Sequence, residues 1–108
     1  HPASALTDVP MPDIAKAKKR CARVAPILKT LAHPQRLFLL CRLAKGEATV
    51  SELRSASGAS QSLISQHLTR MRREGIVQAR RDGNFIHYRI ADARLSALIR
   101  HMEKIFNE

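Results

Sequence analysis

The residues best suited to chemistry lie in one stretch between Ser60 and Gly75, which reads SQSLISQHLTRMRREG. On a helix, at about 100° per residue, its apolar side chains fall on one side and its polar side chains on the other. The polar side begins with hydroxyls and amides, which can hydrogen-bond base edges, and ends with arginines, which can contact phosphates. It comprises Gln61, Ser62, Ser65, Gln66, Thr69, Arg70, Arg72 and Arg73. The pattern predicts a DNA recognition helix, although an exposed amphipathic helix would show it too.

The residues before this stretch favour the first interpretation, because they complete a helix-turn-helix. Ser60 is placed to cap the recognition helix and Gly75 to end it. Upstream, Thr49-Val-Ser-Glu52 is a capping box that opens a short helix, and Gly58-Ala59 turns the chain directly into Ser60. The expected DNA contacts of the recognition helix are Gln61, Ser62, Ser65, Gln66, Thr69 and Arg72.

A β-hairpin is predicted after Gly75, where IVQARR and FIHYRI flank Asp82-Gly83-Asn84. A two-residue loop at Asp82-Gly83 would make one face of the hairpin apolar and the other polar. The apolar face would carry Val77, Ala79, Ile86 and Tyr88, and the polar face Gln78, Arg80, Phe85, His87 and Arg89. A hairpin that directly follows a recognition helix is a wing. Its expected contacts with phosphates or an adjacent minor groove are Arg80, Arg81, Asn84 and His87.

Residues 1–12 contain three prolines and no apolar periodicity, so we expect a flexible arm there and one domain over residues 13–108. Asp13 would cap a first helix, which Pro26 should kink or split. The basic residues within positions 16–23 fit either a solvated face or phosphate contacts. The apolar residues of this helix recur at spacings of three and four, which favours packing against another helix. They are Ile14, Ala17, Cys21, Val24, Leu28 and Leu31.

A second helix is predicted from Pro34 to Ala44 with His33 as its cap, and a last helix begins after Asp92. We expect the second helix to be buried through Leu37, Phe38, Leu40, Cys41, Leu43 and Ala44. The last helix carries a broad apolar stripe of Leu95, Leu98, Ile99, Met102, Ile105 and Phe106. A chain of 108 residues cannot easily bury both terminal stripes within itself. The predicted fold is therefore mainly α with a small β-hairpin, a winged helix-turn-helix that forms a homodimer through its terminal helices.

Charge and composition narrow the class of partner. Nineteen Lys and Arg residues against nine Asp and Glu residues give a net charge of +10, which favours a polyanion. Charge alone does not separate DNA from RNA or an acidic membrane. No apolar run approaches the roughly 18 residues of a membrane span, and two cysteines in a helical chain favour a reducing, cytoplasmic setting. No nucleophile has an evident base and there is no phosphate loop, so we expect neither an enzyme nor a cofactor.

Three blocks of the sequence resemble the ArsR/SmtB family of winged-helix repressors over about residues 24–106. They are LKTLAHPQRLFLLCRL, SELRSASGASQSLISQHLTRMRREGIV and RRDGNFIHYRI. The resemblance implies a homodimer that binds an inverted-repeat operator in double-stranded DNA and releases it when an inducer binds. Carried over residue by residue, the base-reading positions of the family fall on Gln61, Ser62, Ser65 and Gln66.

The metal sites that the family is known for are not expected in this chain. Where metal-sensing members carry a cysteine pair, this chain reads Glu52-Leu53-Arg54-Ser55-Ala56. At the zinc site on the last helix it keeps Asp92, but Arg94 and Ile105 occupy the histidine positions. Arginine and isoleucine cannot ligate a metal.

Cys41 matches the sulfide- and persulfide-sensing branch, whose second cysteine position falls on Asn107 here. Cys21 is the other thiol of the chain. We therefore hypothesise that Cys41 is the primary sensing thiol and Cys21 its candidate partner. A disulfide, a polysulfide bridge or a thiophilic ion such as arsenite could join them. Alternatively, both are inert small hydrophobes, since burial raises a thiol pKa, whereas the neighbouring Arg20, Arg23 and Arg42 would favour thiolate.

Two classes of function fit these patterns. The first is an inducer-responsive, sequence-specific repressor, whose inducer is a reactive sulfur species, an oxidant, or a thiophilic metal or metalloid. The second is an architectural protein that coats DNA without sequence preference. The second would need only the basic surface, and Ser62, Ser65 and Gln66 would then be redundant.

Overall fold

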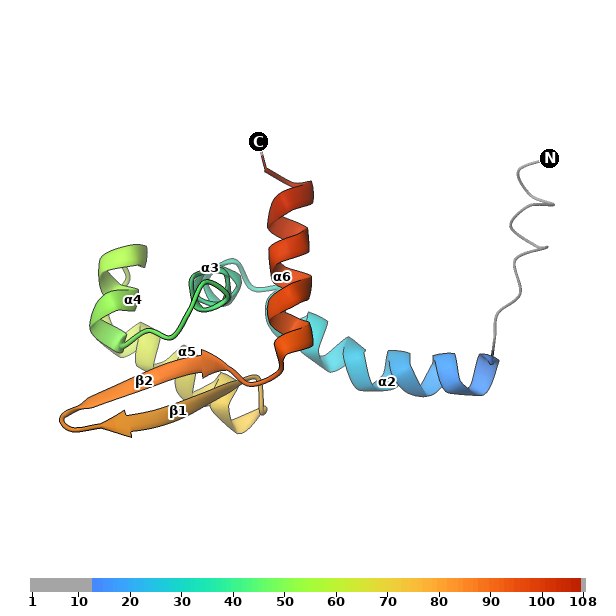
Figure 1. Ribbon diagram of the computed structural model, residues 1–108, viewed down its shortest axis with the longest axis horizontal. Coiled ribbons are helices and arrows are strands. Elements are labelled where there is room, and N and C mark those ends of the chain that lie inside the picture. Colours follow the sequence, from blue (N-terminus) through green and yellow to red (C-terminus); the bar gives the residue numbers. More distant parts are fainter. Residues whose placement is uncertain (1–12, 108) are drawn as a thin grey trace.

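The computed structural model describes residues 13–107. The described chain forms five helices and one two-stranded antiparallel sheet (Figure 1). In chain order these are α2 (Ile14–Leu31), α3 (Pro34–Leu43), α4 (Val50–Ser57), α5 (Gln61–Arg73), β1 (Val77–Asp82), β2 (Phe85–Ile90) and α6 (Ala93–Ile105). No helix in this part of the chain is both long and apolar enough to cross a membrane. The arm expected over residues 1–12 lies outside the described residues, as does residue 108.

Helix α2 extends away from the body of the molecule (Figure 1). As predicted, Asp13 caps it, because its carboxylate accepts a hydrogen bond from the Lys16 backbone N–H at 3.1 Å. Of the kink or split predicted at Pro26, the split is wrong, since the helix runs through this residue to Leu31. Pro26 lacks an N–H for the carbonyl of Ala22, but both residues are exposed, so water can replace the lost hydrogen bond.

The apolar core lies between α3, α4, α5, α6 and the root of the hairpin. Leu40 of α3 is fully buried at its centre, together with Leu53, Ile64, Leu68, Met71 and Ile99. Phe38 was expected in this core but is 49% exposed, and Leu39 is buried in its place. The reason is that α3 packs against α2, α4 and α6 over only part of its circumference, so one of its apolar side chains is left outside.

Local capping signals place the helix-turn-helix as predicted. The Thr49 hydroxyl accepts a hydrogen bond from the Glu52 N–H at 3.2 Å, and the Glu52 carboxylate accepts one from the Thr49 N–H at 3.1 Å. Gly58 ends α4 at φ 71°, a left-handed conformation that glycine adopts without strain. The hydroxyl of Ser60 then accepts a hydrogen bond from the Leu63 N–H at 3.2 Å and opens α5.

The hairpin forms where predicted, but its loop is Gly83-Asn84 rather than Asp82-Gly83. Asp82 is still a strand residue and pairs with Phe85, and at the other end Val77 pairs with Ile90. Gly83 takes the left-handed φ of 61° at the first loop position, which is where a type II′ turn requires glycine. The register differs from the predicted one by two residues. Because side chains alternate with a period of two, the predicted faces are retained.

A residue from the loop before α4 joins the sheet of the hairpin. Ala48, in the loop before α4, exchanges two backbone hydrogen bonds with Tyr88 of β2, at 3.1 and 2.8 Å. Ala48 is fully buried, and Tyr88 packs against the core. The root of the wing is therefore fastened to the segment that begins the helix-turn-helix.

Candidate nucleic-acid interface

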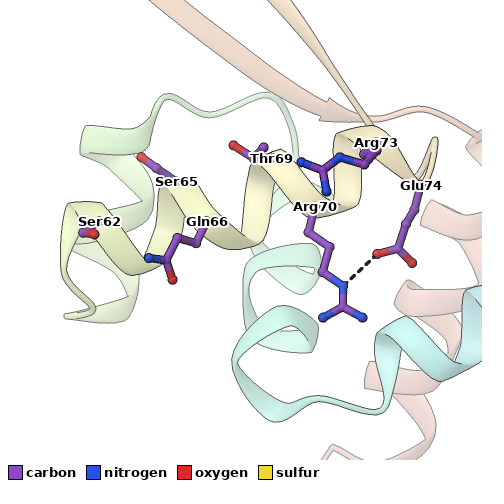
Figure 2. Close-up of a pocket in the computed structure, with 7 residues that line it drawn as sticks. All are labelled: Ser62, Ser65, Gln66, Thr69, Arg70, Arg73 and Glu74. Carbon is purple, nitrogen blue, oxygen red and sulfur yellow. Dashed lines mark hydrogen bonds and ion pairs between the residues drawn. The ribbon is translucent and has the colours of Figure 1, made fainter.

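Helix α5 presents one polar face to solvent and buries the opposite one. Ile64, Leu68 and Met71 are fully buried and fix the rotation of the helix about its axis. The outer side chains line a shallow concave surface, which we call the recognition face (Figure 2). It consists of Ser62, Ser65, Gln66, Thr69, Arg70, Arg73 and Glu74. Its first half offers hydroxyls and an amide for hydrogen bonding, and its second half carries the charges.

Sequence reasoning had placed four of these residues among the DNA contacts: Ser62, Ser65, Gln66 and Thr69. Gln61 and Arg72, also predicted as contacts, are exposed but do not line the concave surface. Arg70 and Arg73 line it instead. Both arginines had been assigned to the polar side of the helix, so the helical pattern contained the signal for them.

Glu74 places a carboxylate at the C-terminal end of the recognition face, and the sequence analysis missed it. Its Oε1 accepts a hydrogen bond from Arg70 Nε at 3.2 Å (Figure 2), and its Oε2 accepts one from Thr30 Oγ1 of α2 at 2.7 Å. The hydrogen bond from Thr30, followed by that from Arg70, lowers the pKa of Glu74 below its ordinary value. Glu74 is therefore ionised and engaged on both oxygens.

The wing packs its root against α5, and its tip projects from the body (Figure 1). Arg80 forms an ion pair with Glu47 at 2.8 Å and lies 3.8 Å from Asp82, so its charge is partly neutralised. Near the tip, Arg81 donates from Nε to the Gly83 carbonyl at 3.3 Å and is exposed. The other two predicted wing contacts differ in access, since Asn84 is exposed and His87 is half-buried. Arg81 and Asn84 are thus more available to a ligand than Arg80 and His87.

Histidine 67 packs at the edge of α5 and does not belong to the recognition face. Its Nε2 lies 3.1 Å from Oε1 of Gln35, and its ring centroid lies 5.1 Å from that of His33. Burial, and after it the positive charges of His33, Arg36 and Arg70, lowers the pKa of His67. His33 occupies the cap position of α3, but its side chain makes no capping hydrogen bond, contrary to expectation. The Nδ1 of His33 is buried without a partner in the described chain.

The two cysteines occupy different environments, and neither forms a disulfide. Cys41 on α3 is half-buried, as expected, whereas Cys21 on α2 is exposed, although its place among the apolar residues of that helix predicts partial burial. Burial raises the pKa of Cys41, and Glu103 of α6 raises it further by its charge and a hydrogen bond, while Lys45 opposes them. The expectation that neighbouring arginines favour a thiolate at Cys41 is therefore wrong. Arg42 instead donates to the Gly46 carbonyl and lies 3.7 Å from Glu52.

Asp92, the residue retained from the family's zinc site, serves as the cap of α6. It accepts a hydrogen bond from the Arg94 N–H at 2.8 Å and forms an ion pair with the Arg94 guanidinium at 2.7 Å. These contacts lower the pKa of Asp92 to about 2. Within residues 13–107, no three His, Cys, Asp or Glu side chains are grouped so that they could hold a metal ion.

Known proteins resemble this chain over most of its length. Residues 33–79 match the family model described as bacterial regulatory protein, arsR family. The biofilm growth-associated repressor of Agrobacterium fabrum is 42% identical over 101 residues, which are 94% of this chain and 84% of that protein. The crystal structure of the transcriptional repressor BigR from Xylella fastidiosa has a TM-score of 0.79 at 40% identity, over 87% of this chain and 96% of that one.

A third similarity is to a protein whose assembly is stated. The homodimeric winged helix-turn-helix DNA-binding domain of Mb0332 from Mycobacterium bovis, a possible ArsR-family regulator, was solved in solution. It matches with a TM-score of 0.67 at 32% identity, over 92% of this chain and 96% of that one.

Proposed function

The chain belongs to the arsR family of bacterial regulatory proteins, and from that premise we propose that it is a repressor that binds an inverted-repeat DNA operator as a homodimer and leaves it when an inducer acts. Membership of the family makes it a transcriptional regulator and not an enzyme. We place its action in the cytoplasm, where a bacterial regulator meets DNA.

The observation that carries the proposal is the recognition face of α5. Its inner side is locked into the core, and its outer side presents the amide of Gln66 and the hydroxyls of Ser62 and Thr69 to solvent. Amides and hydroxyls at these positions can exchange hydrogen bonds with base edges in a major groove. Arg73 on the recognition face and Arg81 on the wing are exposed cations that are suited to phosphates.

Exposed apolar side chains on the two terminal helices support the homodimer. On α2, Ile14 is 62% exposed and Leu28 is 48% exposed, while on α6 Leu98 is 46% exposed, and Ile105 and Phe106 are also exposed. The radius of gyration is 17.3 Å, against about 13 Å for a compact domain of roughly 100 residues. An elongated molecule with apolar residues on its projecting helices gains free energy when a second copy covers them.

We further propose that Cys41 senses the inducer, with Cys21 as its candidate partner. Cys41 lies on α3 beside Glu103 of α6, so a group added to its sulfur would disturb the contact between these helices. A disulfide between Cys41 and Cys21 would release two protons and two electrons to an oxidant such as peroxide. A persulfide could instead transfer its outer sulfur to one thiol and leave as a thiol itself, and arsenite could condense with both thiols with the loss of water.

Binding to operator and random DNA tests the proposal against an architectural role. The affinity for a palindrome from the protein's own promoter and for a random duplex of equal length is measured at the same salt concentration. A specific repressor is expected to prefer the palindrome by about 10³ or more. A ratio near one would instead identify a protein that coats DNA through its net charge of +10.

A further inference from the structure

We propose that Thr30 and Glu74 together restrain Arg70 and so determine how strongly the protein discriminates operator from random DNA. This inference rests on the proposed DNA binding. The two residues form a link, which we call the Thr30–Glu74 latch, between α2 and the end of the recognition helix. In this view Thr30 and Glu74 are positioning residues, and Arg70 is the group that they position.

Thr30 is the buried end of the latch. Thr30 is only 4% exposed, and it is the one buried polar residue among residues 13–107. Its hydroxyl carries a single proton, which can go to Glu74 Oε2 at 2.7 Å or to the Pro26 carbonyl at 3.4 Å, and the shorter contact is the stronger one. Its carbonyl accepts a hydrogen bond from Arg36 Nε at 3.1 Å. Thr30 is thus held on both sides and gives Glu74 a fixed partner.

Glu74 occupies a position where a carboxylate needs compensation. It is the C-cap of α5, where the helix dipole favours a cation over an anion. It is also the acid on the recognition face, where it would repel DNA phosphates. The hydrogen bonds from Thr30 and Arg70 offset both effects in the free protein. The Glu74 carboxylate therefore weakens binding to every duplex, so that selectivity depends on the side chains that contact bases.

Arg70 is the side chain that the latch controls. Its Nε donates to Glu74 Oε1 at 3.2 Å, and Figure 2 shows its guanidinium turned toward the α2–α3 side of the recognition face. The side chain of Arg70 is 64% exposed, so its position depends on the ion pair and not on packing. Released from Glu74, Arg70 could swing to a phosphate of any sequence. That contact would add affinity without adding base preference.

The test compares Glu74→Gln and Thr30→Val with the parent protein on operator and random duplexes over a range of salt concentrations. We expect Glu74→Gln to bind random DNA about two- to five-fold more tightly. In this variant Arg70 can contact a phosphate without first breaking its exposed ion pair with Glu74. The slope of log K against log salt should steepen by about 0.9, since one more phosphate is contacted. The operator-to-random ratio should fall. Thr30→Val should change all three in the same direction by less, and Thr30→Ser should restore parent values.

Two control variants separate the latch from a general effect of charge. Asp13→Asn removes the same charge at the cap of α2, away from the recognition face and with a residue that caps equally well, and should leave the salt slope at the parent value. In an Arg70→Gln background, Glu74→Gln should no longer steepen the slope, because the side chain that it frees is absent. If Thr30→Val does not fold, Thr30→Ser and the Glu74–Arg70 double-mutant cycle still decide the question.

An NMR pH titration of the Glu74 carboxyl gives a readout that does not depend on DNA. Its pKa should lie below the ordinary glutamate value in the parent protein and rise in Thr30→Val. The inference is overturned if Glu74→Gln leaves the ratio and the salt slope unchanged, or if the steeper slope persists without Arg70. A parent ratio near one would refute sequence-specific repression, while the salt slopes would still report on the latch.

Discussion

Gln66 and Arg81 are both exposed, but they are suited to different parts of a duplex. Gln66 lies in the hydrogen-bonding half of the recognition face, whereas Arg81 lies near the tip of the wing. We predict that Gln66→Ala reduces the preference among single-base operator variants by about 1–3 kcal/mol, the value of a good base contact. Arg81→Ala should weaken binding to all sequences alike and flatten the salt dependence. Titrations of both variants against a panel of operators will measure this.

The same experiment checks the orientation of α5 on DNA. If Gln66→Ala keeps the parent order of preference among the operator variants, another part of the recognition face reads the bases. Ser62→Ala removes a hydroxyl one helical turn earlier on the same exposed face, and it should relax the base preference in the same way.

Cys41 should react slowly as a thiol, because burial and Glu103 keep it protonated. We predict that iodoacetamide at pH 7.5 modifies Cys41 more slowly than the exposed Cys21. Glu103→Gln should accelerate the reaction at Cys41, since it removes the negative charge that raises this pKa. Mass spectrometry of each cysteine-containing peptide follows both rates, and Glu47→Gln, an acid on another surface, serves as the control.

Operator release by Cys41→Ser and Cys21→Ser tests the sensing role. Each protein is treated with persulfide, peroxide and arsenite, and release is compared with the parent. Equal release by Cys41→Ser with every inducer would end the hypothesis of thiol sensing at this residue. Parent-like release by Cys21→Ser alone would mean that Cys41 acts without a partner thiol.

The sequence predicts single residues well where one helix determines their placement. The outward direction of Gln66 follows from periodicity, because the apolar positions around it must face the core. The contact between Thr30 and Glu74 could not be predicted, since 44 positions separate them and only the tertiary fold brings the end of α2 to the end of α5. The same holds for Glu103 beside Cys41. In the sequence Cys41 adjoins Arg42, whereas in the folded chain the acid Glu103 raises its pKa.

Local capping and turn residues determined where most helices and strands begin and end. The capping residues Asp13, Thr49, Ser60 and Asp92 all lie where the sequence placed them, because each cap is a contact within four residues. The hairpin loop was placed one residue too early, since Asp-Gly and Gly-Asn are both suitable turn pairs. Pro26 did not split α2, because proline can be tolerated in an exposed helix at the cost of one hydrogen bond.

The contact between α3 and α5 at His67 should make stability depend on pH. Folding lowers the pKa of His67, so below about pH 6.5 the unfolded chain binds more protons than the folded one. This contribution to stability is present above pH 6.5 and is lost as the pH falls below it. We predict that urea unfolding shows a larger loss of stability between pH 7.5 and 5 for the parent than for His67→Gln. His101→Gln, at an exposed histidine, should behave as the parent does.

For the whole molecule, we predict a stable homodimer whose interface includes α2 and α6. Leu98→Glu would place a charge on the exposed apolar part of α6, so the protein should become monomeric or unfolded. It should then lose most of its operator affinity, because a dimer must bind both half-sites together. Ala93→Glu is the control, since it adds the same charge at an exposed position in the first turn of α6, where an acid is tolerated. Sedimentation of the unmutated protein as a well-folded monomer would contradict the prediction.

The two hydrogen bonds between Ala48 and Tyr88 have a consequence for the entropy of association. They fasten the root of the wing to a fully buried residue of the segment that leads into α4. The root of the wing is therefore held against the helix-turn-helix before either meets a duplex. A protein whose two contact elements are already fixed relative to each other loses less conformational freedom when it binds. More of the interaction energy of both elements then remains as affinity, and a duplex with an unsuitable groove geometry cannot be accommodated by moving the wing.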